Sequence, residues 1–214
     1  LDEAYLDVTE CKTGETDPVQ IASEIKAKIL ETTRLTCSAG VSYNKFLAKI
    51  GSDLEKPDGL VHIPPERAQE LLFKLPIGKF HGIGRVTAAR MQKLGITCGA
   101  DLYKWELKDL LKRFGKVGMF YYQVIRGIDN RDLVTTWDPK SISCEHTFDS
   151  DISSMEELLE SLQALSQRLA NRMQQKNITG GTIVLKLKYD NFEYITRTAS
   201  LPEFTNAAEV LYKC

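Results

Sequence analysis

The 214-residue chain has no long apolar run and no excess of charge of either sign. No stretch approaches the roughly 20 apolar residues that a helix needs to cross a bilayer, so we expect no membrane partner. The first ten residues, LDEAYLDVTE, carry acids where a signal peptide carries bases, which predicts a cytoplasmic protein. Lys and Arg number 28 against 29 Asp and Glu, so the net charge of -1 gives no indication of a nucleic-acid partner.

Cysteine is scarce and scattered, which excludes a disulfide framework and a zinc site. The five cysteines form no C-x-x-C pair and have no histidine pattern beside them, so we expect reduced, structural thiols. The chain also lacks an initial Met, begins inside a strand-like segment and ends inside a helix-like one. We therefore expect a fragment of a longer protein.

The hydrophobic pattern predicts an α+β multi-domain chain. Residues 1–76 alternate strands and helices, beginning with a strand over 1–9, as in a partial α/β domain. Residues 77–130 contain helical patterns only. Residues 131–141 lack periodicity and are interpreted as a linker. Residues 142–214 predict a second, partial α/β domain with a strand over 142–148, a long helix and two further strands.

Charge is unevenly shared between these parts. Residues 79–144 hold 12 basic and 6 acidic side chains, a net of +6, between neighbours of -4 and -3. Electrostatic attraction acts over a Debye length of about 8 Å, so a local excess matters more than the total. The helical unit is thus the candidate phosphate-binding part.

A glycine hairpin lies in this basic unit, at Gly82-Ile83-Gly84, and the sequence RVTAARMQKLGI follows it. This pattern is typical of a helix-hairpin-helix, in which the glycines let a phosphate approach the backbone and the second helix offers free amides. Ile83 is expected to anchor the hairpin in the helical core. A tight turn between helices with no ligand is the alternative interpretation.

Two further pairs could bind a nucleotide and its metal. Asp2 and Glu3 supply the oxygen ligands that Mg²⁺ prefers, although acidic pairs at strand ends are usually just solvated. Lys45 and Lys49 are four residues apart and share one helix face, where they could neutralise a triphosphate or simply be solvated.

Three segments in this order resemble the Y-family translesion DNA polymerases, most closely the bacterial DinB type. They are LDEAYLDVT, SAGVSYNKFLAKIGSDLEKPDGL and HGIGRVTAARMQKLGI. The resemblance implies a partial palm over 1–76, a helical thumb over 77–130 and a truncated little finger over 142–214. It also implies a low-fidelity, template-directed polymerase that transfers dNTP to a primer 3′-hydroxyl.

The same resemblance assigns roles to single residues. It makes Asp2 and Glu3 the catalytic ligands of a two-metal Mg²⁺ site, and it places Lys49 and Lys45 on the triphosphate. It places the hairpin, the linker exit and a basic strip of the little finger on primer-template DNA. These DNA-binding residues are Gly82, Ile83, Gly84, Arg85, Lys140, Ser141, Lys186, Lys188 and Arg197.

The resemblance also implies missing parts. The palm strand with the first catalytic aspartate, the fingers and the end of the little finger have no counterpart, and neither has the tail that binds a sliding clamp in this family. We therefore expect a monomer that binds DNA but cannot polymerise alone. The alternatives are a non-catalytic DNA-binding module with a vestigial acidic pair and, more distantly, a nuclease or repair protein that shares the hairpin.

Overall fold

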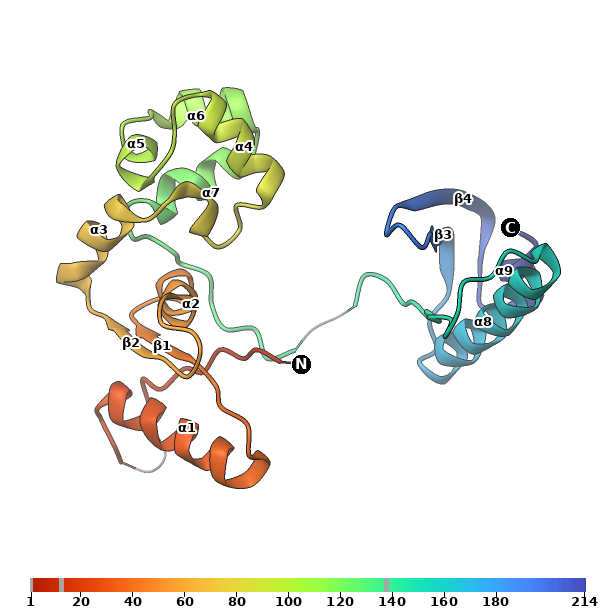
Figure 1. Cartoon of the computed structure of the whole chain (residues 1–214), viewed down its shortest axis with the longest axis horizontal. Helices are drawn as coiled ribbons and strands as arrows, with labels where there is room; N and C mark the ends of the chain where they lie inside the picture. Colours follow the sequence, from red (N-terminus) through yellow and green to blue (C-terminus); the bar gives the residue numbers. More distant parts are fainter. Residues whose placement is uncertain (1, 12–13, 137–138) are drawn as a thin grey trace. The chain divides into compact units, whose positions relative to one another are not determined.

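The computed structural model describes residues 2–11, 14–136 and 139–214. The chain forms two compact units, Leu1–Thr135 and Thr136–Cys214 (Figure 1). Leu1 of the expected first strand lies outside the described residues, as do Trp137 and Asp138 of the expected linker. No helix among the described residues has the length and apolar character needed to cross a membrane.

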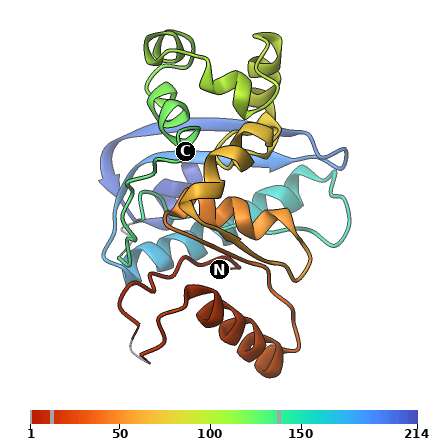
Figure 2. The same ribbon diagram turned by 90° about the vertical axis from the view of Figure 1, so that its left-hand side faces the viewer.

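The first unit is built around a parallel pair of short strands, β1 (Ala39–Ser42) and β2 (Leu60–Ile63). Parallel strands need a crossover connection, and helix α2 (Lys45–Leu54) supplies it. Helix α1 (Pro18–Thr33) lies on the other side of the strands from α2 (Figures 1 and 2). The alternation of helices and strands expected within residues 1–76 is confirmed for this part of the chain.

Local chemistry explains where the two helices begin. Asp17 caps α1 by accepting a hydrogen bond from the Val19 amide at 2.8 Å, with Pro18 in the first turn. Asn44 caps α2 through the Leu47 amide at 3.0 Å. Helix α2 also lies so close to β1 that a Cβ on Gly40 would be 1.9 Å from the Ala48 carbonyl oxygen.

Between residues 65 and 124 the first unit is helical, and the sequence predicts helices without strands from residue 77 onward (Figure 2). Its elements are α3 (Pro65–Lys74), the 3-10 turn η1 (Ile77–Lys79), α4 (Arg85–Lys93), α5 (Gly99–Tyr103), α6 (Leu107–Phe114) and α7 (Val117–Val124). One hydrophobic core joins these helices to α2. Within it the ring of Phe46 packs 6.0 Å from Phe80 and 6.2 Å from Phe120, measured between centroids. The α/β part and the helical part therefore share their packing.

The second unit pairs a long helix with an antiparallel ribbon. It comprises α8 (Met155–Gln175), β3 (Gly180–Lys188), β4 (Tyr194–Thr205) and α9 (Ala208–Lys213). Its core is small, with Ala170, Met173 and Leu211 buried and Ile142 and Ile183 packed against them.

Two predicted strands do not form. Residues 2–8 and 141–148 have no regular secondary structure, although their sequences alternate like strands. A strand needs a neighbour whose amides and carbonyls complete the ladder, and no described segment runs beside either one as a strand. The alternation of apolar and polar residues shows that a segment suits a β-sheet, but a strand forms only where a second strand lies beside it.

Candidate functional site

The acidic pair and the lysine motif meet in the first unit. Lys49 Nζ, from the middle of α2, lies 2.7 Å from Glu3 Oε1, and Asp2 is exposed beside Glu3. The hydrogen bond with Glu3 raises the pKa of Lys49 above its ordinary value, despite the opposing effect of partial burial. Residues 46 positions apart in sequence are thus brought to one place as an ion pair.

Asp53 completes this cluster, and sequence reasoning did not single it out. Its carboxylate lies 3.2 Å from Lys49 Nζ and 2.6 Å from Lys56 Nζ. Although partial burial raises the pKa of Asp53, hydrogen bonds from Lys56 and Lys49 bring it below its ordinary value. The spacing of four residues from Lys49 on a helix was the available signal.

The acidic pair is only part of a metal site. Asp2 and Glu3 offer the oxygen donors suited to Mg²⁺. Within the described ranges, however, no three His, Cys, Asp or Glu side chains gather closely enough to hold a metal ion. Glu3 is moreover occupied by Lys49. The described residues alone therefore do not form a complete two-metal centre.

Lys45 contacts different groups from Lys49, although both project from α2. Its ammonium donates to the carbonyl oxygen of Asp132 at 2.9 Å and lies 5.5 Å from the ring centroid of Tyr5. Partial burial raises the pKa of Tyr5, an effect that the nearby cations Lys49 and Arg131 reduce. Lys45 thus links α2 to two other segments of the unit.

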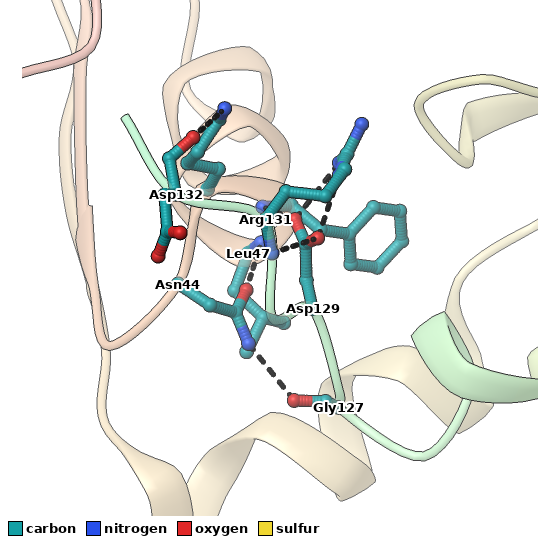
Figure 3. A network of polar contacts seen from close by, with 8 residues as sticks. Asn44, Leu47, Gly127, Asp129, Arg131 and Asp132 are labelled. Atoms are coloured by element: carbon teal, nitrogen blue, oxygen red, sulfur yellow. Dashed lines mark hydrogen bonds and ion pairs between the residues drawn. The ribbon is translucent and has the colours of Figure 1, made fainter. Parts of the chain in front are cut away.

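The first turn of α2 is held by the segment that follows α7 (Figure 3). Asp129 Oδ2 accepts from the Phe46 amide at 3.0 Å, and Asn44 Nδ2 donates to the Gly127 carbonyl at 2.8 Å. Arg131 donates to the same carboxylate, from Nε to Oδ1 at 2.6 Å and from Nη2 to Oδ2 at 2.8 Å. This hydrogen bonding lowers the pKa of Asp129. Sequence reasoning missed this network, because Asp129 is 83 residues from its amide partner.

The glycine hairpin has the geometry that was expected of it. Gly82 has φ of +88°, which favours glycine, and a Cβ there would be 3.0 Å from Phe120. Ile83 is 5 % exposed and packs in the core, which confirms its anchoring role. Gly84 is the N-cap residue of α4, and it has no side chain that could accept from the first amides of the helix. Arg85 follows directly and is exposed.

The basic residues of the second unit do not share one face. In the antiparallel register Lys186 lies opposite Thr196 and Lys188 opposite Tyr194, whereas Arg197 lies opposite Leu185. Directly opposed residues project to the same side, and neighbours along a strand to opposite sides. Arg197 is therefore on the other face, and the expected strip is reduced to the two lysines. Lys140 and Ser141 are exposed and outside helices and strands.

Comparison with protein families gives three matches along the chain. The impB/mucB/samB family model matches residues 1–53, the HHH motif of the same family matches 65–96, and its C-terminal domain matches 139–214. The second match covers the hairpin, and the first covers the acidic pair and both lysines.

Curated relatives cover almost the whole chain. DNA polymerase IV of Alkalilimnicola ehrlichii is 45% identical over 98% of this chain and 59% of its own length. That of Bacteroides fragilis is 46% identical over 99% of this chain and 58% of its own length. The chain thus spans about 60% of the length of such relatives.

A solved structure supports the same assignment. The "Y-family DNA polymerase chimera Dbh-Dpo4(243-245)-Dbh" matches with a TM-score of 0.73 and 25% identity, over 97% of this chain and 60% of that one. The chain therefore belongs to the impB/mucB/samB family, as a DinB-type member of the Y-family DNA polymerases.

Proposed function

We propose that this chain is the palm, thumb and little-finger portion of a template-directed, low-fidelity translesion DNA polymerase. Its reaction joins a dNTP to a primer 3′-hydroxyl. The observation that carries the proposal is the contact between Lys49 and Glu3, which places a cation suited to a triphosphate against a carboxylate suited to a metal. Two relatives, 45% and 46% identical, are each named DNA polymerase IV, which supports the same reaction.

In this proposal Asp2 and Glu3 are ligands for Mg²⁺, which in two-metal sites stabilises the attacking and leaving oxygens of an in-line displacement. Lys49 binds the triphosphate and offsets the charge that develops as pyrophosphate leaves. Lys45 is already held by the Asp132 carbonyl, so it is the weaker candidate for triphosphate contact.

We propose further that the 214 residues alone bind primer-template DNA but do not extend the primer. Among the described residues no group of three His, Cys, Asp or Glu side chains is arranged to hold a metal ion, which supports this. We also place the protein in the bacterial cytoplasm as a monomer, with any sliding-clamp contact made by the longer protein. A non-catalytic DNA-binding module remains the second candidate function, favoured by the uncapped start of α4.

Primer extension separates these two functions. The chain would be completed at both ends with the corresponding segments of a DNA polymerase IV relative and assayed beside the 214-residue chain. We expect extension by the completed polypeptide only, with Glu3→Gln and Lys49→Ala each slower by roughly a hundredfold. Lys28→Ala, an exposed lysine on α1, is the control. Synthesis by the 214 residues would refute their inactivity, and full activity of Glu3→Gln would refute the site.

The hairpin is tested by binding of duplex DNA at several salt concentrations. A Cβ at Gly84 meets nothing within 4 Å, so Gly84→Ala with Arg85→Ala changes the surface without disturbing the core. We expect weaker binding of every sequence and a salt slope smaller by about 1, because only phosphate contacts are lost. The control is again Lys28→Ala. Unchanged affinity in the double variant would remove the hairpin from the DNA interface.

A further inference from the structure

We infer that Asp129 is a positioning residue for the nucleotide site, acting through the first turn of α2. This inference rests on the proposed role of Lys49 as a triphosphate ligand and adds a residue on which that role depends. Asp129 touches neither Lys49 nor the acidic pair. Its influence runs through the backbone of the helix that carries Lys49.

The first observation is how completely Asp129 is engaged. Its side chain is only 3% exposed, and it accepts from the Phe46 amide and from the fork of Arg131 (Figure 3). A carboxylate at a helix start is favoured by the free amides and by the dipole. The amides of Phe46 and Leu47 at the start of α2 are therefore already used by Asp129 and Asn44, and are not free to bind a triphosphate.

The second observation is that the same segment holds α2 at three separate points. Besides Asp129 on the Phe46 amide, the Gly127 carbonyl accepts from Asn44 and the Asp132 carbonyl accepts from Lys45. Three contacts within six residues restrain both the rotation and the sliding of the first turn. Arg131 in turn orients the Asp129 carboxylate through two parallel hydrogen bonds.

The third observation connects this turn to the groups proposed to bind metal and triphosphate. Lys45 and Lys49 are one helical turn apart. Lys45 lies over the ring of Tyr5, and Lys49 pairs with Glu3, two residues earlier in the irregular segment 2–8. This N-terminal segment is therefore attached to α2 at two points. A shift in the first turn would move Lys49 and change where it meets Glu3.

Binding of inorganic tripolyphosphate to the 214-residue chain, followed by calorimetry, tests the inference. Asp129→Asn keeps the side-chain volume and an oxygen that can accept from the Phe46 amide, but it removes the negative charge that pairs with Arg131. We expect it to weaken binding roughly three- to tenfold. Asp132→Asn is the matched control, since it makes the same change three residues away. The group of Asp132 that takes part in the network is its backbone carbonyl, which the substitution leaves in place.

A double-mutant cycle distinguishes positioning from a purely structural role. In a Lys49→Ala background Asp129→Asn should cause no further loss, because the lysine through which it acts is gone. The amide resonance of Phe46 should shift in Asp129→Asn and not in Asp132→Asn. Should Asp129→Asn fail to fold, Arg131→Gln frees the same carboxylate from a half-exposed partner and is expected to weaken binding in the same direction.

The outcomes separate the inference from the function beneath it. If Lys49→Ala binds tripolyphosphate as well as the wild type does, the proposed nucleotide site fails and the inference fails with it. If Lys49→Ala weakens binding but Asp129→Asn does not, only the inference fails. Equal losses in Asp129→Asn and Asp132→Asn, or a full further loss in the Lys49→Ala background, would likewise overturn it.

Discussion

Lys49 Nζ and Glu3 Oε1 are 2.7 Å apart, so a residue assigned to the triphosphate and a residue assigned to a metal neutralise each other. The lysine side chain is 13% exposed and the carboxylate 61% exposed. The ion pair therefore holds an otherwise irregular segment, residues 2–8, against α2. The same contact means that each ligand must compete with an internal partner of opposite charge.

Gly40→Ala should strongly destabilise the first unit. A Cβ there would lie 1.9 Å from the Ala48 carbonyl oxygen and 2.4 Å from the Ser52 amide nitrogen, which are backbone atoms of α2. We expect a loss of at least about 3 kcal/mol in the free energy of unfolding. Urea denaturation measures it, with Gly84→Ala as the control that meets no neighbour. Equal stability of the two variants would contradict the close approach of β1 and α2.

Phe46→Ala should destabilise the first unit as a whole and leave the second unit unchanged. The fully buried ring contacts Phe80 and Phe120, so its removal leaves a cavity in the shared core. The expected cost is about 3–5 kcal/mol. Calorimetry should show one of two unfolding transitions moved to lower temperature, and the other unmoved. A shift of both transitions would mean that the two units unfold together.

The stabilisation from Asp129 should disappear in acid. The hydrogen bonds from Arg131 lower the pKa of Asp129 in the folded state, so the unfolded chain binds the proton more readily. The contribution is complete above the unfolded pKa of about 3.9 and is lost as pH falls through the lower folded pKa. The difference in stability between wild type and Asp129→Asn should therefore shrink below about pH 4. Urea titrations at several pH values measure it, and a constant difference down to pH 2 would contradict the pairing.

Lys186 and Lys188 should contribute to DNA binding where Arg197 does not. The register places the two lysines on one face of the ribbon and the arginine on the other. If DNA lies along the lysine face, Lys186→Ala and Lys188→Ala should each reduce the salt slope of binding by about 1. Arg197→Ala is the matched control and should leave the slope unchanged. A slope reduced only by Arg197→Ala would place DNA on the opposite face.

Local patterns in the sequence were sufficient for much of this structure. The helices over α1, α2 and α8 follow from apolar spacing and from capping residues such as Asp17, because a helix completes its hydrogen bonds within itself. The hairpin at Gly82 to Gly84, with Ile83 in the core, was likewise predicted from the residue types alone. The family resemblance came from the same motifs.

Contacts between distant segments were beyond such patterns. The strand expected over residues 1–9 depends on a neighbouring strand with which to pair. The strip of Lys186, Lys188 and Arg197 depends on a pairing register that alternation does not reveal. The Asp129 carboxylate reaches an amide 83 residues away, and Lys49 reaches Glu3 across 46. A helix is determined mainly by residues close together in the sequence. The contacts of Asp129 with Phe46 and of Lys49 with Glu3, in contrast, form only because packing of the first unit brings distant segments together.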